Sequence, residues 1–233
     1  MSVLAVITAR GGSKRIPRKN IKLFAGKPML QYAIDAALMS RIFDEVMVST
    51  DDIEIARIAQ ASGAQVPFMR SEKTANDYAT TCDVIEEVLT EYHKRGRDFD
   101  TVCCIYPCVP FLSAETLRNA LLQMGEHDAI MPVCAYPVPV EWAHELDESG
   151  VLRCRDKRAC SMRSQDLRKC YYDVGMFYFC KTEKALSLHT ICPDDTLGYV
   201  IPESECQDID TMDDWNMAEL KYELLKQRNL LRK

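Results

Sequence analysis

The chain has 233 residues, 47% of them hydrophobic, which is enough to bury one sizeable core or two small ones. Its longest stretch without a charged residue, residues 101–114, contains Pro107 and Pro110 and is too short to cross a bilayer. Only residues 3–7 form an apolar run before Arg10, so no secretory signal is indicated. We therefore expect a folded, cytoplasmic protein with no membrane partner.

Charge is distributed unevenly along the chain. The formal net charge is −6, yet residues 1–34 carry seven Lys and Arg residues and no acidic residue, so the remainder carries −13. A basic tail for nucleic acid would be terminal and low in complexity, whereas these bases lie between an apolar run and an amphipathic run. We predict a folded basic loop and no nucleic-acid partner.

The elements predicted in chain order begin with a strand over Val3–Thr8, because the run VLAVIT is apolar and rich in β-branched residues. Pro28 in a first turn, followed by apolar residues at helical spacing, predicts a helix that begins there. Val46–Thr50 predicts a second strand, and Asp51 or Asp52 would cap the next helix. The opening unit is therefore strand, basic loop and helix.

The same alternation continues along the chain. Further strands are predicted over Gln65–Met69, Thr101–Tyr106, Ala129–Cys134, Met176–Cys180 and Tyr199–Ile201, and helices over residues 78–94, 113–124 and 213–228. This alternation predicts the α/β fold class, with a mostly parallel, Rossmann-like sheet and helices on both of its faces.

Residues 137–170 interrupt the alternation, because Pro137, Pro139, Gly150 and mixed charges leave no sustained period of either kind. We expect a small insertion arm there, which is either a solvated surface loop, a lid over the functional site or a dimer contact. No repeat or long linker divides the rest of the chain. We therefore expect a single domain over residues 1–233.

The eleven cysteines are an odd number in a long chain without an export signal, so we expect reduced thiols. Neither paired CxxC knuckles nor an HExxH helix is present, which disfavours a zinc site. Burial as small apolar side chains is the interpretation that fits better.

The first chemical motif is the loop ARGGSKRIPRKN at residues 9–20, directly after the first strand. Paired glycines let backbone amides approach phosphate oxygens, and the basic side chains neutralise them, so the loop predicts a polyphosphate cradle. Neither GxGxxG nor GxxxxGK[ST] occurs, which disfavours a dinucleotide fold and a P-loop NTPase. The alternative is a solvated basic turn, in which five close bases would repel one another without an anion among them.

The second motif is the segment QDIDTMDDW at residues 207–215. If it is extended, Asp208 and Asp210 share one face and Ile209 points to the other, which is a suitable mount for Mg²⁺. The alternative is that these acids only begin the following helix. Thr211 or Asp213 could cap the helix alone. The sequence pattern therefore leaves two roles equally open for Asp208 and Asp210, as metal ligands or as surface residues.

These two motifs, with RSEKTANDYATT at 70–81 and YPCVPF at 106–111, resemble in order and spacing the cytidylyltransferases that activate sialic-acid-like sugars as CMP conjugates. The resemblance spans nearly the whole chain. RSQDL at 163–167 and the DxGxFY block at 173–178 are most similar to the pseudaminate branch of that family.

The resemblance implies a nucleotidyltransferase fold, Mg²⁺ as cofactor, a homodimer, and transfer of CMP from CTP to the 2-hydroxyl of a nonulosonic acid. Its implied catalytic residues are Arg10, Lys14, Lys19, Asp208 and Asp210, the last two also being the metal ligands. Its implied nucleotide-binding residues are Ala9, Arg10, Gly11, Gly12, Ser13, Lys14, Lys19, Asn20, Arg70, Ala79 and Thr81. Its implied sugar-binding residues are Tyr106, Arg163, Gln165 and Asp173.

The chain departs from the family pattern at Tyr106, where many relatives have Gln, and at Leu112, where an Arg is common. We expect an acid-sugar pocket that is less polar than one for N-acetylneuraminate, and pseudaminic acid as the substrate. Alternatives are N-acetylneuraminate, legionaminate or 3-deoxy-manno-octulosonate as acceptor. A non-catalytic nucleotide-binding protein is the alternative from a different class.

Overall fold

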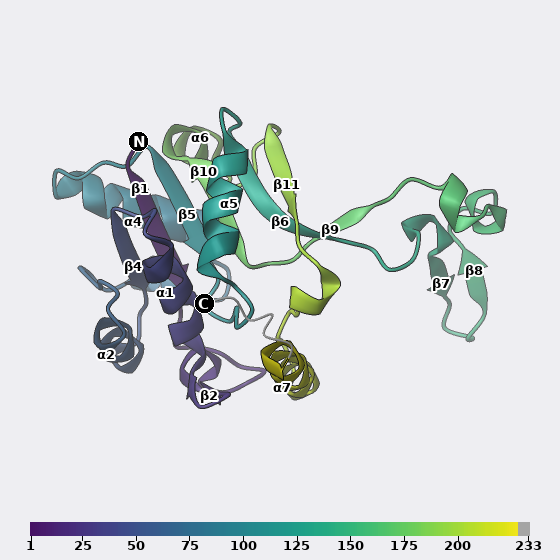
Figure 1. Ribbon diagram of the computed structural model, residues 1–233, viewed down its shortest axis with the longest axis horizontal. Coiled ribbons are helices and arrows are strands. Elements are labelled where there is room, and N and C mark those ends of the chain that lie inside the picture. Colours follow the sequence, from purple (N-terminus) through teal and green to yellow (C-terminus); the bar gives the residue numbers. More distant parts are fainter. Residues whose placement is uncertain (228–233) are drawn as a thin grey trace.

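The computed structural model describes residues 1–227, which form a seven-stranded sheet with helices on both faces (Figure 1). The strand order is β11-β6-β10-β5-β1-β4, and β9 pairs with β6. The strands are β1 (Val3–Thr8), β4 (Glu45–Ser49), β5 (Thr101–Ile105), β6 (Ala129–Ala135), β9 (Tyr171–Asp173), β10 (Phe177–Lys181) and β11 (Thr196–Val200). Only β9 and β10 run against the other five. The predicted fold class is confirmed.

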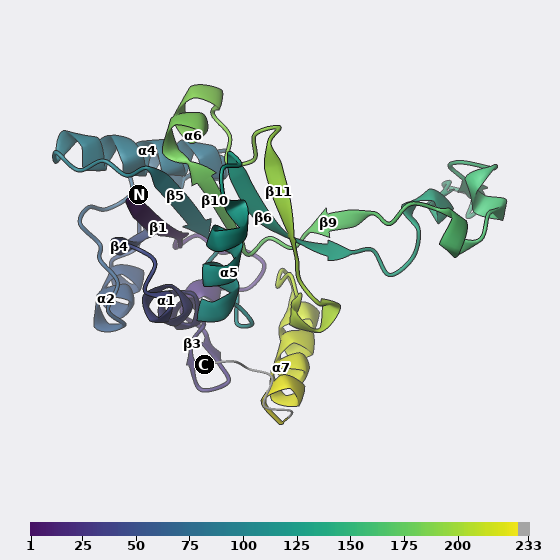
Figure 2. The same ribbon diagram turned by 45° about the horizontal axis from the view of Figure 1, so that its top comes forward.

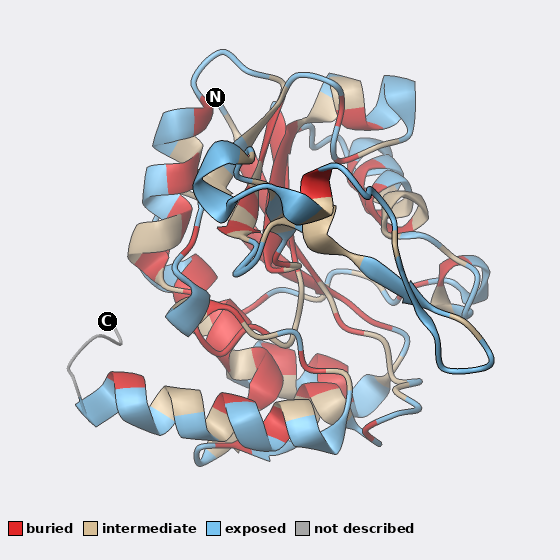
Figure 3. Ribbon diagram, turned by 90° about the vertical axis from the view of Figure 1, so that its right-hand side faces the viewer, coloured by how far each residue is buried: buried red, intermediate tan, exposed pale blue. Residues whose placement is uncertain are grey.

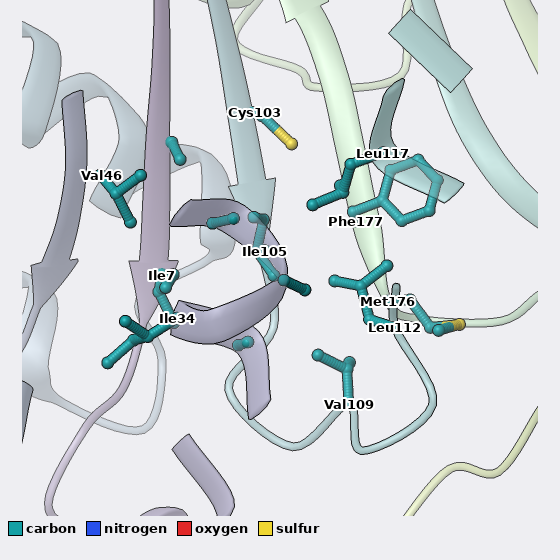
Figure 4. Close-up of a cluster of buried hydrophobic side chains, with 14 of the residues drawn as sticks. Ile7, Ile34, Val46, Cys103, Ile105, Val109, Leu112, Leu117, Met176 and Phe177 are labelled. Carbon is teal, nitrogen blue, oxygen red and sulfur yellow. The ribbon is translucent and has the colours of Figure 1, made fainter. Parts of the chain in front are cut away.

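Burial on both faces explains why the first strand has no polar residue between Val3 and Ile7. Val3, Ala5 and Ile7 enter a cluster with α1 (Met29–Ser40), α2 (Ile53–Ala61) and α5 (Ala114–Met124), part of which Figure 4 shows. Leu4 and Val6 point the other way, toward α4 (Thr81–Lys94) and α6 (Thr182–Leu188). Alternating side chains of one strand therefore join two separate cores.

Side-chain caps set the beginnings of three helices. Asp52, not Asp51, caps α2 by accepting hydrogen bonds from the backbone N–H groups of Glu54 and Ile55. Thr80 and Asp83 form a capping box, so α4 begins at Thr81 rather than at the predicted residue 78. Ser113 caps α5 by accepting a hydrogen bond from the backbone N–H of Thr116.

A third cluster joins the two ends of the chain. The hairpin of β2 (Leu23–Phe24) and β3 (Lys27–Pro28) packs on α7 (Met212–Gln227), where the ring of Phe24 meets Trp215 edge-on at 5.4 Å. In Figure 3, α7 lies along the bottom with buried residues between its exposed ones. Ile16 and Ile209 belong to the same cluster, so it brings both predicted motifs together.

The segment between β6 and β9 forms an arm that projects away from the sheet (Figures 1 and 2). It contains β7 (His144–Leu146), β8 (Leu152–Cys154) and the 3-10 turns η2 (Val140–Trp142), η3 (Ala159–Ser161) and η4 (Ser164–Asp166). The remaining short elements of the described chain are η1 (Lys19–Ile21), α3 (Glu72–Ala75) and η5 (Glu203–Glu205). Among residues 1–227, no helix is both long and apolar enough to cross a membrane.

Two predictions need correction. Gln65–Met69 is not a strand: Gln65 makes a single bridge to Met47, and Pro67 lacks the N–H that a continued ladder needs. Reduced thiols are wrong for two cysteines, because a disulfide joins Cys154 to Cys160. A turn held by the Asp156 carboxylate folds the chain back and brings these two residues together. The helices α3 and α6 were not predicted, since both are too short for periodicity to reveal.

Candidate active site

The basic loop lies at the carboxyl end of β1 and surrounds a cavity of about 360 Å³. That cavity is lined by Thr8, Arg10, Ser13, Lys14, Arg15, Ile16, Lys19, Asn20 and Pro107. Asn20 is buried and its amide donates to the Arg10 carbonyl at 2.8 Å, which holds the loop closed from within. The structure thus gathers five of the predicted nucleotide-binding side chains around one space.

The two glycines of the loop differ in their surroundings. The Gly11 amide donates to the Asp51 carboxylate at 2.8 Å, and a Cβ on Gly11 would lie 2.9 Å from the Asp52 side chain. Nothing lies within 4 Å of the corresponding position on Gly12. Gly11 is therefore required by the close approach of the α2 cap, whereas Gly12 leaves its space open.

The bases of the loop have acidic partners from other parts of the chain. Arg10 and Lys14 both contact Asp77, at 3.0 and 2.5 Å, and the Lys14 hydrogen bond holds the pKa of Asp77 below its usual range. Arg18 pairs with Asp52 at 2.5 Å. The expected repulsion among the bases is thus relieved by tertiary contacts, which a count within the loop could not include.

Lys19 connects the basic loop to the aspartate motif. Its ammonium donates to the Ile209 carbonyl at 2.5 Å and lies 3.6 Å from the Asp210 carboxylate. Arg15 makes a second contact with Asp210, at 2.7 Å. The predicted phosphate cradle and the predicted metal ligands therefore form one continuous site.

The aspartate motif has the geometry expected for an extended segment. Ile209 is 1% exposed in the third cluster, while Asp208 and Asp210 line a common pocket. The surrounding protein raises the pKa of Asp208 by displacing water, and the negative charge of Asp210 raises it further. Helix α7 is capped by Thr211 and Asp214 instead, so capping does not account for Asp208 and Asp210.

The pocket beside these aspartates has a volume of about 690 Å³. Its lining comprises Tyr106, Tyr172, Asp173, Val174, Gly175, Tyr178, Glu203, Cys206, Gln207, Asp208, Asp210, Asp214 and Lys221. Five carboxylates thus face one ammonium, that of Lys221, which donates to the Cys206 carbonyl at 2.8 Å. Such a concentration of hard oxygen donors fits a divalent cation of the Mg²⁺ type.

The aromatic wall of this pocket is held by hydrogen bonds. Tyr178 donates to the Asp173 carboxylate at 2.7 Å, and the Tyr106 hydroxyl lies 3.2 Å from that of Thr81. The two rings are 5.4 Å apart. Burial and the bond to Asp173 raise the pKa of Tyr178, so its hydroxyl keeps its proton at neutral pH.

Of the residues predicted to meet the nucleotide, Arg70 lies at the carboxyl end of β4, whereas Ala79 lines a separate pocket beside α4. Arg70 is 8% exposed and donates to the side chain and the carbonyl of Ser49, at 3.0 and 2.7 Å. Burial lowers the pKa of its guanidinium. The Ala79 amide donates to the Asn76 side chain at 3.0 Å. Arg70 thus supports the backbone beside the basic loop.

Three predicted sugar-site features lie elsewhere. Arg163 and Gln165 are exposed on the arm and do not line the pocket, although Tyr106 and Asp173 do. Leu112, expected near the sugar, is 7% exposed and packs in the core of the α1 face. It follows the turn after β5 and belongs to the core cluster instead of the pocket lining.

Sequence reasoning missed three residues of the site: Asp77, Tyr178 and Lys221. Asp77 lies within the motif RSEKTANDYATT at residues 70–81, and its negative charge could have been matched to the positive charges of the basic loop. Tyr178 lay within the DxGxFY block, where the alternation of β10 places it opposite Phe177. Lys221 carries no local signal, because only the packing of α7 brings it to the pocket.

Comparisons with known proteins give a consistent answer. The cytidylyltransferase family model matches residues 4–169. A pseudaminic acid cytidylyltransferase from Campylobacter jejuni is 36% identical over 226 residues, covering 96% of this chain and 97% of that protein. A CMP-N,N'-diacetyllegionaminic acid synthase from Legionella pneumophila is 32% identical, again covering 96% of this chain and 97% of that protein.

Among solved structures, a CMP:2-keto-3-deoxy-manno-octonic acid synthetase complexed with CTP superposes with a TM-score of 0.70. It is 19% identical, and the match covers 98% of this chain and 100% of that one, so the likeness concerns the fold. The fold and the site define a nucleotidyltransferase. The chain belongs to the cytidylyltransferase family and is a CTP-dependent enzyme, which confirms the family resemblance found in its sequence.

Proposed function

We propose that the chain transfers CMP from CTP to the 2-hydroxyl of pseudaminic acid and releases pyrophosphate. The observation that carries this proposal is the continuity of the basic loop with the aspartate pocket through Lys19 and Asp210. The identity to a pseudaminic acid cytidylyltransferase supports the choice of acceptor.

In the proposed reaction, the hydroxyl oxygen forms a bond to the α-phosphorus of CTP while the bond to pyrophosphate breaks. Arg10 and Lys14 exchange the Asp77 carboxylate for the β- and γ-phosphates, which carry more charge than one carboxylate. Lys19, beside Asp210, is placed to neutralise charge that builds at the α-phosphate. The proton of the hydroxyl leaves to a base that we do not assign.

Asp208 and Asp210 are the residues that would hold Mg²⁺. When bound, the ion supplies electrostatic stabilisation of the phosphate oxygens and of the leaving pyrophosphate. The raised pKa of Asp208 fits this role, because a cation relieves the repulsion between the two carboxylates.

The pocket of Tyr106, Tyr178 and Asp173 is the proposed sugar site. Pseudaminic acid carries a second acylamino group and a methyl carbon in place of hydroxyls, which suits aromatic rings better than a fully polar wall. Asp173 can accept from an acylamino N–H, and the Lys221 ammonium is the cation in the lining that can face the sugar carboxylate.

We also infer that the arm contacts a second copy of the chain. Eight large apolar or aromatic residues of the arm and its base are exposed, namely Tyr136, Val138, Val140, Leu146, Val151, Leu152, Met162 and Tyr171. Arg163 and Gln165 would then act, if they bind sugar, in the pocket of the other copy. Sedimentation analysis should show a dimer that Leu146→Glu with Leu152→Glu weakens, whereas Leu122→Glu on α5 leaves it intact.

The experiment that tests the function is incubation with CTP, Mg²⁺ and each acid of a panel: pseudaminate, legionaminate, N-acetylneuraminate and 3-deoxy-manno-octulosonate. We expect stoichiometric pyrophosphate and a CMP conjugate of pseudaminate by mass, with no product from UTP. A conjugate with legionaminate alone would move the assignment to that acceptor. Binding of CTP without pyrophosphate release from any acid would contradict an enzymatic role.

A further inference from the structure

The arm carries a cluster of soft ligands outside the site described above. His144 on β7 pairs in register with Cys154 on β8, and Cys160 of η3 completes the group. The ligand atoms of the three residues lie within 4.8 Å of one another, and the two cysteines are joined as a disulfide. Imidazole and two sulfurs at this separation are the donor set that Zn²⁺ prefers.

A hydrogen bond orients His144 within the cluster. Its Nδ1 lies 2.8 Å from the carbonyl oxygen of Trp142, a contact that requires the proton to reside on Nδ1. The lone pair of Nε2 is then free to bind a metal. Zinc-ligating histidines are characteristically held in this way by a backbone carbonyl or a carboxylate.

The backbone of Glu141 contacts the cluster. Its carbonyl oxygen lies 3.7 Å from the Cys160 sulfur. Its carboxylate oxygen Oε2 is buried and has no hydrogen-bond partner within the described residues 1–227. A buried carboxylate oxygen without a donor is costly, and a cation bound on this part of the arm would lower that cost.

The arm buries too little apolar surface to hold its fold without a cross-link. Among residues 136–170, all of which are described, only Ala159 is buried. A segment with so little apolar burial cannot offset the entropy of ordering its chain, and small folds of this kind are held by disulfides or metals. The disulfide supplies this cross-link when the cysteines are oxidised.

We propose that in the reduced protein Cys154, Cys160 and His144 bind one Zn²⁺, so that metal and disulfide are alternative cross-links of the arm. Reduction by a dithiol forms two protein thiols and converts the dithiol to its own disulfide. Zinc binding then releases the two thiol protons, and water fills the fourth position. This site is independent of the proposed CMP transfer, which uses oxygen ligands on the body of the protein.

Cobalt is the probe for this site, because thiolate ligands give Co²⁺ intense near-ultraviolet charge-transfer bands that aspartate ligands do not. The full chain, reduced and stripped of metal, is titrated with Co²⁺ and then with Zn²⁺. We expect one equivalent of cobalt with thiolate bands, all displaced by zinc. Cys154→Ser, Cys160→Ser and His144→Ala should each weaken cobalt binding at least about tenfold, whereas Cys170→Ser, also on the arm, should not.

His144→Ala separates the metal site from the disulfide. This variant should still lose two free thiols on oxidation, as the wild type does, while its cobalt affinity falls. Unchanged circular dichroism melting of the variants shows that the body of the protein is folded. Absence of thiolate bands in the reduced wild type, or equal cobalt affinity of wild type and His144→Ala, would overturn the proposal.

Discussion

The ammonium of Lys19 lies 3.6 Å from the carboxylate of Asp210, and it donates to the carbonyl of Ile209, 190 residues away in sequence. The contact is partly buried, because the side chains of Lys19 and Asp210 are 21% and 33% exposed. It makes the basic loop and the aspartate pair parts of one electrostatic unit, so under the proposed function a change in either half should alter the chemical step.

Asp208→Asn and Asp210→Asn should each lower kcat by about a hundredfold or more while leaving the fold intact, because each removes a charged ligand near the reacting phosphates. Pyrophosphate release measured across a range of Mg²⁺ concentrations checks this. Asp213→Asn, on the exposed first turn of α7, is the matched control and should retain activity. Turnover close to wild type at saturating Mg²⁺ would exclude the metal assignment.

Arg10→Ala and Lys14→Ala should weaken CTP binding or slow transfer, with losses of about 1.5–3 kcal/mol each if the phosphate contacts are charge-assisted. The KM for CTP and kcat of each variant give these energies. Lys94→Ala removes another exposed lysine, one that pairs with Glu91 on α4, and it should change neither constant. Equal constants for all four proteins would mean that the cradle bases are only solvated surface.

Gly11→Ala and Gly12→Ala form a matched pair. The new methyl group on residue 11 would meet the Asp52 side chain at 2.9 Å, so we expect a loss of about 1–3 kcal/mol in unfolding free energy and weaker CTP binding. The methyl group on residue 12 meets no atom within 4 Å and should leave the melting temperature unchanged. A melting temperature for Gly11→Ala equal to that of Gly12→Ala would contradict the close approach of the α2 cap.

Asp208 should give the enzyme an acid-side loss of metal affinity. Its pKa is raised, so as pH falls the carboxylate takes up a proton earlier than an ordinary aspartate, and Mg²⁺ loses a ligand. At limiting Mg²⁺, activity should fall toward acidic pH and recover when Mg²⁺ is added. A pH profile that does not shift with Mg²⁺ concentration would contradict this.

The same raised pKa has a consequence for stability. At a pH above the raised pKa, the folded protein holds a charged Asp208 in unfavourable surroundings, which lowers its stability. The folded state binds the Asp208 proton more tightly than the unfolded state does, so this loss of stability disappears as the pH falls. Without Mg²⁺ at neutral pH, Asp208→Asn should therefore melt no lower than the wild type. Differential scanning calorimetry of both proteins with and without Mg²⁺ provides the measurement. If Asp208→Asn melted at a clearly lower temperature than the wild type without Mg²⁺, the predicted effect of the Asp208 charge on stability would be contradicted.

Local patterns predicted most of this structure. The strand Val3–Thr8, the basic loop after it and the extended Asp208 and Asp210 follow from periodicity and spacing within short segments. Contacts across the fold could not be predicted in this way. Asp77 meets the basic loop and Lys221 meets the pocket beside the aspartates only because separate elements pack together.

The predictions that the structure corrects failed for the same reason, because they depend on contacts between distant parts of the chain. Leu112 was expected near the sugar from the family pattern, in which an Arg is common at this place, but its side chain is buried in the core on the α1 face. The disulfide of Cys154 and Cys160 depends on the hairpin of the arm, for which the sequence shows no period.

The most direct test of the account is a competition between equal concentrations of pseudaminate and N-acetylneuraminate for limiting CTP, with the two CMP conjugates resolved by mass. Tyr106 and Tyr178 present aromatic rings to one side of the pocket, which suit the methyl carbon of pseudaminate better than the terminal hydroxyl of the N-acetylneuraminate glycerol chain, and an unpartnered hydroxyl of this kind discriminates by about a hundredfold. We predict that kcat/KM for pseudaminate exceeds that for N-acetylneuraminate by at least about a hundredfold. Equal amounts of the two conjugates, or an excess of the N-acetylneuraminate conjugate, would contradict the assignment.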